Sequence, residues 1–254
     1  MINYIKSELY RILHTKNIYI VTLILCGVTL FVNGILFLFS QLDRGFIYGT
    51  VSFSLSNLVT SIDIVFLVGA CIVFVLYNEK NNIKNVISYG ISREKIFIGK
   101  CIVSAIFSIC ILFLVLAVFV GTSVLLLEPG PIEGAVMILF KGIACILIMA
   151  IAFQVLAIAL YDHYKKVVYA FLVWYLIEDT IPYLFLLIGL KVDVFAKIAV
   201  WMPYNYLSRN YIRMDCWECI WQTSEGVSKC IISGIIGLVI FLAVGLKLCK
   251  KQEV

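Results

Sequence analysis

The sequence predicts an all-α protein that crosses a membrane six times, and composition, apolar runs and charge distribution all indicate it. Of the 254 residues, 63% are hydrophobic and 14% are charged, and the mean hydropathy is +1.07. Soluble domains are about half apolar and about a quarter charged. A chain this apolar lacks the polar residues that cover a water-exposed surface. We therefore expect one transmembrane domain over residues 1–254.

Six apolar runs are long enough to cross a bilayer. A helical span needs about 20 mostly apolar residues, because the hydrocarbon is about 30 Å thick and a helix rises about 1.5 Å per residue. The third and fourth runs are longer than one crossing requires, so we expect tilt or extension beyond the bilayer. The expected spans are 18–39, 55–77, 97–127, 135–161, 167–190 and 230–248.

The distribution of positive charge predicts the orientation. Most of the 20 lysines and arginines lie before the first span, between the second and third, between the fourth and fifth, and after the sixth. Loops rich in these residues stay in the cytoplasm. We therefore expect a multi-pass protein of the bacterial plasma membrane with both termini cytoplasmic. Residues 191–229 then form an extracellular segment, whose tryptophans and tyrosines, Trp221 among them, are expected at the lipid headgroups.

Residues 1–16 form an amphipathic segment. Apolar side chains such as Ile5, Leu9 and Ile12 recur at spacings of three and four, and Glu8 and Arg11 belong to the opposite, polar face. The segment is too polar to span hydrocarbon, so we expect a helix along the cytoplasmic interface. A plain charged flank that only sets topology is the alternative interpretation.

Residues 79–96 connect the second and third spans and contain a second short amphipathic pattern. Asn82 is a favourable N-cap, and Ile83, Val86 and Ile87 share one helical face. Gly90 suits the left-handed position that ends a helix. We expect a short helix lying crosswise beneath the bilayer, whose apolar face needs lipid or protein. A solvated turn whose lysines only set topology is the alternative.

The next helix is expected to begin after this connection. Ser92 is a suitable N-cap, and Glu94 in the first turn complements the helix dipole. We expect this helix to continue into the third span.

This connection resembles the first cytoplasmic loop of ABC type-2 transporter permeases. The similar positions are Glu79, the IKN triplet 83–85, SYG 88–90, ISR 91–93 and Lys100. The closest similarity is to small bacterial permeases of lantibiotic immunity, bacitracin resistance and toxin-peptide export. Many relatives carry Gly-Thr where this chain has Asn81 and Asn82, which also suit a turn.

The resemblance implies that the short helix is a coupling helix seated in a cytosolic ABC ATPase subunit. It also implies re-entrant or interfacial outer helices after the fifth span, and a second permease chain in a homodimer or heterodimer. The implied cargo is a hydrophobic or amphipathic peptide, antimicrobial or toxic, that is exported. The expected coupling residues are Glu79, Asn82, Ile83, Lys84, Val86, Ile87, Tyr89, Gly90 and Arg93.

Several kinds of chemistry have no sequence motif here. The chain has no G-x-x-x-x-G-K-[ST] motif, so ATP and Mg²⁺ are expected on the partner ATPase and no cofactor on this chain. It has only two histidines, His14 and His163, and no H-E-x-x-H motif. We therefore expect no catalytic residue and no metal site.

Two cysteines lie in the expected extracellular segment. Cys216 and Cys219, in CWEC, form a candidate disulfide on an oxidising side of the membrane. Free thiols are the alternative, and two ligands alone make a poor zinc site.

Polar residues inside the apolar runs are candidates for a translocation path, because ionised groups at membrane depth are costly. These candidates are Asp63, Gln154, Glu178 and Asp179. Glu178 and Asp179, before Pro182, either break the fifth span and line a route or mark its end near water. Asp63 is also a candidate partner for Lys141, and Gln154 for an interhelical hydrogen bond.

Two rival functions stay open. A secondary carrier would use Asp63 and Glu178 as proton sites. A membrane sensor or scaffold would transport nothing. The apolar composition and the six runs fit all three functions equally, so only the resemblance of the 79–100 region favours the ATP-driven exporter.

Overall fold

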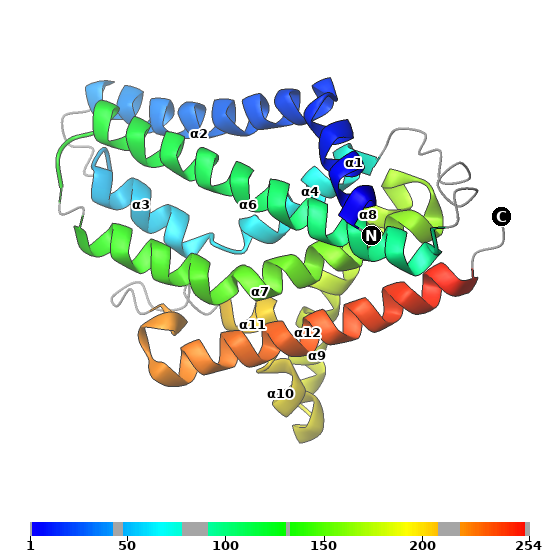
Figure 1. Ribbon diagram of the computed structural model, residues 1–254. Coiled ribbons are helices and arrows are strands. Elements are labelled where there is room, and N and C mark those ends of the chain that lie inside the picture. The colour runs from blue at the N-terminus through cyan, green and yellow to red at the C-terminus, as the bar shows by residue number, and fades with distance from the viewer. Residues whose placement is uncertain (1, 43–47, 78–90, 131–132, 208–218, 252–254) are drawn as a thin grey trace.

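The computed structural model describes residues 2–42, 48–77, 91–130, 133–207 and 219–251 (Figure 1). These residues are overwhelmingly helical, and within them the only β-type pairing is an isolated bridge between Thr50 and Glu128. The elements are α1 (Ile2–Leu13), α2 (Lys16–Leu42), α3 (Val51–Thr60), α4 (Ile64–Tyr77), α6 (Arg93–Leu126), α7 (Glu133–Tyr164), α8 (Val167–Tyr175), a π-helical segment (Leu176–Thr180), α9 (Ile181–Gly189), α10 (Asp193–Ala199), α11 (Pro203–Leu207), a 3₁₀ turn (Ile220–Gln222) and α12 (Ser224–Lys251).

Five helical segments are long and apolar enough to cross a membrane, and a sixth is obtained if α3 and α4 count as one bent span. The helical class and the membrane character of the chain agree with the sequence prediction. The long third span is one helix of 34 residues that begins at Arg93 rather than near 97. At about 1.5 Å per residue it is about 50 Å long, more than one bilayer crossing.

The second expected span is not one straight helix. Its two halves, α3 and α4, are bent by 70° between Thr60 and Ile64. Asp63 lies at this bend: its carbonyl accepts from the Phe66 amide at 2.9 Å, and its carboxylate lies near its own and the Ile64 backbone amides. A short polar side chain that binds nearby backbone groups competes with helical hydrogen bonding. The expected 55–77 span is thus present as a bent pair of helices, and it is one crossing if α3 and α4 count together.

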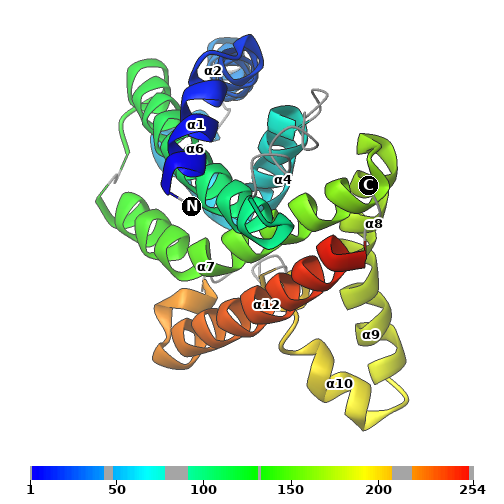
Figure 2. The same cartoon turned by 45° about the vertical axis from the view of Figure 1, so that its right-hand side comes forward.

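Helix α7 lies at the centre of the bundle, with α12 and α4 against it (Figures 1 and 2). In its most apolar stretch 78% of residues are buried, compared with 6% in α2. Close packing against α12 depends on Gly234 and Gly237, whose missing side chains leave room for Ile148 and Met149 of α7. Such small residues let transmembrane helices approach closely.

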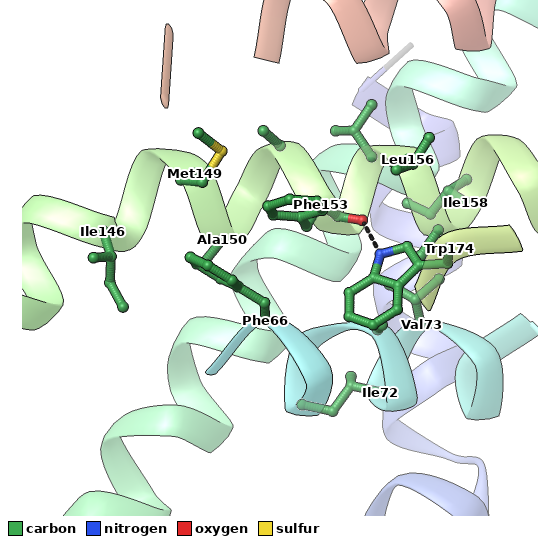
Figure 3. Close-up of a cluster of buried hydrophobic side chains, with 14 of the residues drawn as sticks. Phe66, Ile72, Val73, Ile146, Met149, Ala150, Phe153, Leu156, Ile158 and Trp174 are labelled. Carbon is green, nitrogen blue, oxygen red and sulfur yellow. Dashed lines mark hydrogen bonds between the residues drawn. The ribbon is translucent and has the colours of Figure 1, made fainter. Parts of the chain in front are cut away.

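Aromatic side chains fill the centre of this core (Figure 3). Phe153 of α7 lies between Phe66 of α4 and Trp174 of α8, at ring-centroid distances of 5.1 and 6.0 Å. The Trp174 indole N–H donates to the Phe153 carbonyl at 3.1 Å, so the ring is buried with its polar atom satisfied.

One buried side-chain amide, that of Asn33, attaches the peripheral helix α2 to the rest of the bundle. The Asn33 amide nitrogen donates to the Phe119 carbonyl at 3.0 Å and to the Thr122 hydroxyl at 2.8 Å, both on α6. The Ser54 hydroxyl of α3 donates to the Asn33 amide oxygen at 2.6 Å. This one side chain therefore joins three helices, and the sequence analysis did not identify it.

The fifth span is continuous. Helices α8 and α9 and the π-helical segment between them form one apolar run, Val167–Gly189. Glu178 and Asp179 therefore neither break the span nor end it, because the wider π turn accommodates them within the helix. Helix α10 then folds back on α9, where the Gly189 position packs on the Ala196 backbone (Figure 2). The described residues of the 191–229 segment form the short helices α10 and α11, the 3₁₀ turn Ile220–Gln222 and the first residues of α12.

Candidate functional site

The expected coupling residues fall mostly outside the described residues. Positions 79–90 lie outside the described residues, so the short coupling helix stays a prediction. Arg93 is described and is the first residue of α6. Ser92 has the extended backbone of an N-cap, and Glu94 lies in the first turn, but the Ser92 side chain makes no capping hydrogen bond. The helices that flank this connection, α4 and α6, are therefore the parts of the site that the structure describes.

The end of α4 and the beginning of α6 are joined directly. Tyr77, the last residue of α4, donates its hydroxyl hydrogen to the Lys100 carbonyl at 3.2 Å. The Lys100 ammonium lies 5.1 Å from the centre of the Tyr77 ring. Both side chains are almost completely buried, at 1% and 2% residue exposure. The two helices that carry the 78–92 connection are thus fastened to each other.

A buried ion pair connects this joint to the central helix. The Lys100 ammonium lies 2.7 Å from the Asp162 carboxylate near the end of α7, and the side chains are 2% and 8% exposed. Burying either charge without a counter-charge would cost several kcal/mol, and the pair offsets part of that cost. Asp162 was missed in the sequence analysis, where Lys100 counted only as a topogenic and family-like residue. The available signal was a single acid in the last turn of a long apolar run.

Helix α1 also contacts the end of α4. The Arg11 guanidinium pairs with Glu8 at 2.7 Å, donates to the Leu76 carbonyl at 3.5 Å and lies 5.9 Å from the Tyr77 ring centre. Glu8 is buried, whereas the amphipathic pattern placed it on a solvated face. The interpretation of Glu8 was wrong because Arg11, one turn later, neutralises its charge inside the packed interface.

We call Glu8, Arg11, Tyr77, Lys100 and Asp162 the junction cluster. It joins α1, α4, α6 and α7 at the end of the bundle where α12 also ends. Lys250 of α12 pairs there with Glu94 at 3.0 Å, and both side chains are largely exposed. Charge-assisted hydrogen bonds are short and directional. A displacement of the 78–92 connection would therefore move α7 as well.

Three of the candidate path residues lie near one another. Asp63 at the α3–α4 bend and Glu178 and Asp179 in the π-helical segment are close enough to interact electrostatically. Tyr204 of α11 lies beside the Asp179 carboxylate. Gln154 is separate from them, in the interface of α7 with Gly69 of α4.

The expected pairing of Asp63 with Lys141 was wrong. Among the described residues no ion pair joins the two, and Lys141 is exposed on the surface of α7. The Asp63 carboxylate instead lies near the backbone amides at the start of α4, whose dipoles favour its charged form.

The expected aromatic belt is only partly at the surface. Trp201 is 47% exposed, but Trp221 is completely buried against α7, where its indole N–H donates to the Ile138 carbonyl at 3.0 Å. Cys219 is buried just before the 3₁₀ turn, and Cys216 lies outside the described residues, so their disulfide stays a prediction. The described residues contain no group of three metal-binding side chains.

Comparison of the chain with protein-family models, with curated proteins and with solved structures finds no match. The resemblance of the 79–100 region and the geometry of the junction cluster therefore carry the functional argument.

Proposed function

We propose that this chain is the membrane-spanning permease subunit of an ABC type-2 exporter whose ATP is hydrolysed by a separate cytosolic subunit. The observation that supports it most is the junction cluster, because it ties both helices flanking the 78–92 connection to the central helix α7. The resemblance of the residues in that connection to the permease family suggests the partner, an ABC ATPase, and the cargo class, a hydrophobic or amphipathic peptide. A second permease chain completes the pathway.

In this mechanism the ATPase subunit binds the apolar face that contains Ile83 and Ile87. Nucleotide binding displaces the ATPase subunit, and the ends of α4 and α6 move with it. The Lys100–Asp162 pair transmits this movement to α7. Helix α7 packs on α12 and α8, so the displacement reaches the remaining spans. The work comes from the difference in nucleotide affinity between the two states of the complex.

A proton-coupled carrier is the second candidate function, and one observation favours it. Asp63, Glu178 and Asp179 lie close together where one span bends and another contains a π-helical segment. Carboxylates at membrane depth mark ion paths in many transporters, and helix irregularities are frequent at such sites.

The decisive experiment measures ATP hydrolysis in the complex purified from native membranes through a tag on this chain. We expect Ile87→Glu and Arg93→Glu to release the ATPase and to lower the co-purifying hydrolysis at least tenfold. The first places a carboxylate in an apolar contact, and the second reverses the charge at the start of α6. Gln222→Glu is the matched control, since Gln222 is exposed and precedes α12 at the opposite end of that helix from Lys250. Undiminished ATPase binding in both variants would overturn the coupling role.

A transport measurement separates the two candidate functions. Inside-out membrane vesicles, whose cytosolic face is outward, are given a labelled amphipathic peptide together with ATP or a proton gradient, each with and without an uncoupler, and peptide uptake is measured. The exporter requires ATP and tolerates the uncoupler. Transport that is abolished by the uncoupler and indifferent to ATP establishes the carrier instead.

A further inference from the structure

A small cavity lies inside the bundle, between α4, α6 and α7. Its volume is about 20 Å³. Apolar side chains form most of its wall, including Val65, Ile72, Leu112 and Ala150. Figure 3 shows Ile72 on α4 and Ala150 on α7, the two helices whose interface contains the cavity.

Two polar atoms in this wall are buried without a hydrogen-bond partner among the described residues. They are the hydroxyl oxygen of Ser108 on α6 and the amide oxygen of Gln154 on α7. Each residue is only 5% exposed. Leaving such a group without a partner costs about 1–3 kcal/mol, and nearly all buried polar groups in folded proteins are satisfied.

Gly69 of α4 determines how Gln154 lies in this cavity. A side chain at this position would place its first carbon 2.6 Å from the Gln154 amide nitrogen. The Gln154 side chain therefore packs directly against the α4 backbone. Gln154 lines the same cavity as Ser108.

We infer that the cavity binds one water molecule that bridges Ser108 and Gln154. A cavity of about 10–15 Å³ already accommodates a water molecule. The Gln154 oxygen is only an acceptor, so the ligand must donate, while the Ser108 hydroxyl can donate or accept. The inference does not depend on the proposed function.

Other small ligands fit this site less well than water. A calcium ion takes six to eight oxygen ligands, more than these two side chains supply. An ammonium-sized cation would bring a charge into a site whose wall contains no carboxylate. Water alone matches the size, the neutral charge and the hydrogen-bonding needs of both side chains.

Radiolytic hydroxyl-radical footprinting of the unaltered protein tests for this water. Radicals formed from a bound water oxidise the side chains beside it, so we expect Ile72 to be labelled at least fivefold faster than Val103 and Ile146. Those two control residues are as buried as Ile72 but do not line the cavity. Labelling of Ile72 at the rate of the controls overturns the proposal.

A double-mutant cycle tests the bridge. Ser108→Ala and Gln154→Met are each expected to lower the folding equilibrium constant about five- to thirtyfold, which corresponds to one or two kcal/mol. Because both act on the same water, the double variant is expected to lose at least fivefold less than the product of the two effects. Ser104→Ala is the matched control, since the Ser104 hydroxyl already donates to the Lys100 carbonyl at 2.8 Å.

Combined with Gln154→Met, the control substitution is expected to be additive. Additive effects of Ser108→Ala and Gln154→Met overturn the bridge. If a variant does not fold, the footprint of the unaltered protein still decides whether the cavity holds water.

Discussion

The Lys100 ammonium of α6 lies 2.7 Å from the Asp162 carboxylate of α7, and both side chains are almost completely buried. The two residues are 62 positions apart in the sequence. The side chains are only 2% and 8% exposed, so the pair constrains how α6 and α7 pack. Tyr77 of α4 is attached to the same lysine, which brings a third helix into the constraint.

Removing one charge of this pair is expected to destabilise the protein strongly. Lys100→Met leaves the Asp162 carboxylate buried beside an apolar side chain, which costs about 3–5 kcal/mol. The double variant Lys100→Met/Asp162→Leu removes both charges and is expected to recover most of this loss. Chemical unfolding in detergent micelles measures both. A double variant as unstable as the single one would contradict the argument.

The exposed pair between Glu94 and Lys250 is the control for that experiment. Its side chains are 47% and 67% exposed, and solvent screens exposed pairs so that each contributes at most about 1 kcal/mol. Lys250→Met is therefore expected to change the free energy of unfolding by less than 1 kcal/mol. A larger loss would mean that the end of α12 depends on this contact.

Tyr77→Phe tests whether the junction cluster transmits movement. The substitution keeps the ring and removes a hydrogen bond worth about 1 kcal/mol, so the fold is expected to persist. If the chain couples to an ATPase, hydrolysis continues while transported peptide per ATP falls. The ratio of transport to hydrolysis in reconstituted vesicles measures this effect. An unchanged ratio would show that the tyrosine hydroxyl is only structural.

Asn33→Leu is expected to loosen α2. It removes two hydrogen bonds to α6 and leaves the Ser54 hydroxyl without its acceptor, at a cost of about 1–2 kcal/mol. Ser40→Ala is the control, because the Ser40 hydroxyl donates only to the Phe37 carbonyl within α2. Unfolding titrations compare the two. Equal effects would indicate that the Asn33 bridge contributes nothing to stability.

Gly142→Ala is expected to disturb the packing around the Trp221 side chain. The added carbon would lie 2.7 Å from the indole ring and 2.8 Å from Ile62, and overpacking of this kind costs about 1–3 kcal/mol. Gly27→Ala is the control: nothing lies within 4 Å of its added carbon, and alanine favours a helix over glycine by up to about 1 kcal/mol. The two substitutions are thus expected to shift the thermal midpoint in opposite directions. Shifts of the same sign would refute the packing argument.

Cys219 is expected to react slowly with alkylating reagents. Burial raises the pKa of its thiol to about 11, and only the thiolate is nucleophilic, so little reactive form exists at pH 8. Its alkylation rate, read by mass spectrometry of the reduced protein, is expected to rise at least tenfold on unfolding. The same method without reduction shows whether Cys219 pairs with Cys216. Rapid labelling of folded, reduced protein would contradict the burial of this thiol.

The sequence by itself determined the helical membrane architecture and the approximate ends of its long helices. The reason is that a backbone in hydrocarbon must satisfy its own hydrogen bonds, which leaves a long apolar run few choices besides a helix. The N-terminal helix α1 was predictable for a different reason: its apolar residues recur with helical periodicity.

Interruptions within a span were less predictable. The sequence marked Glu178 and Asp179 as a disturbance, but a π turn keeps the helix continuous. It also marked Asp63 as unusual without revealing a 70° bend. In both cases the sequence locates the irregularity but does not determine whether the backbone widens into a π turn or bends.

Only the tertiary structure decided which polar side chains meet. Lys100 with Asp162, Arg11 with the end of α4, and Asn33 with Ser54 each join different helices. In a membrane, lipid and side chain are equally apolar, so packing of small residues and polar contacts select the neighbours of each helix. Such contacts depend on shapes that a single apolar run does not encode.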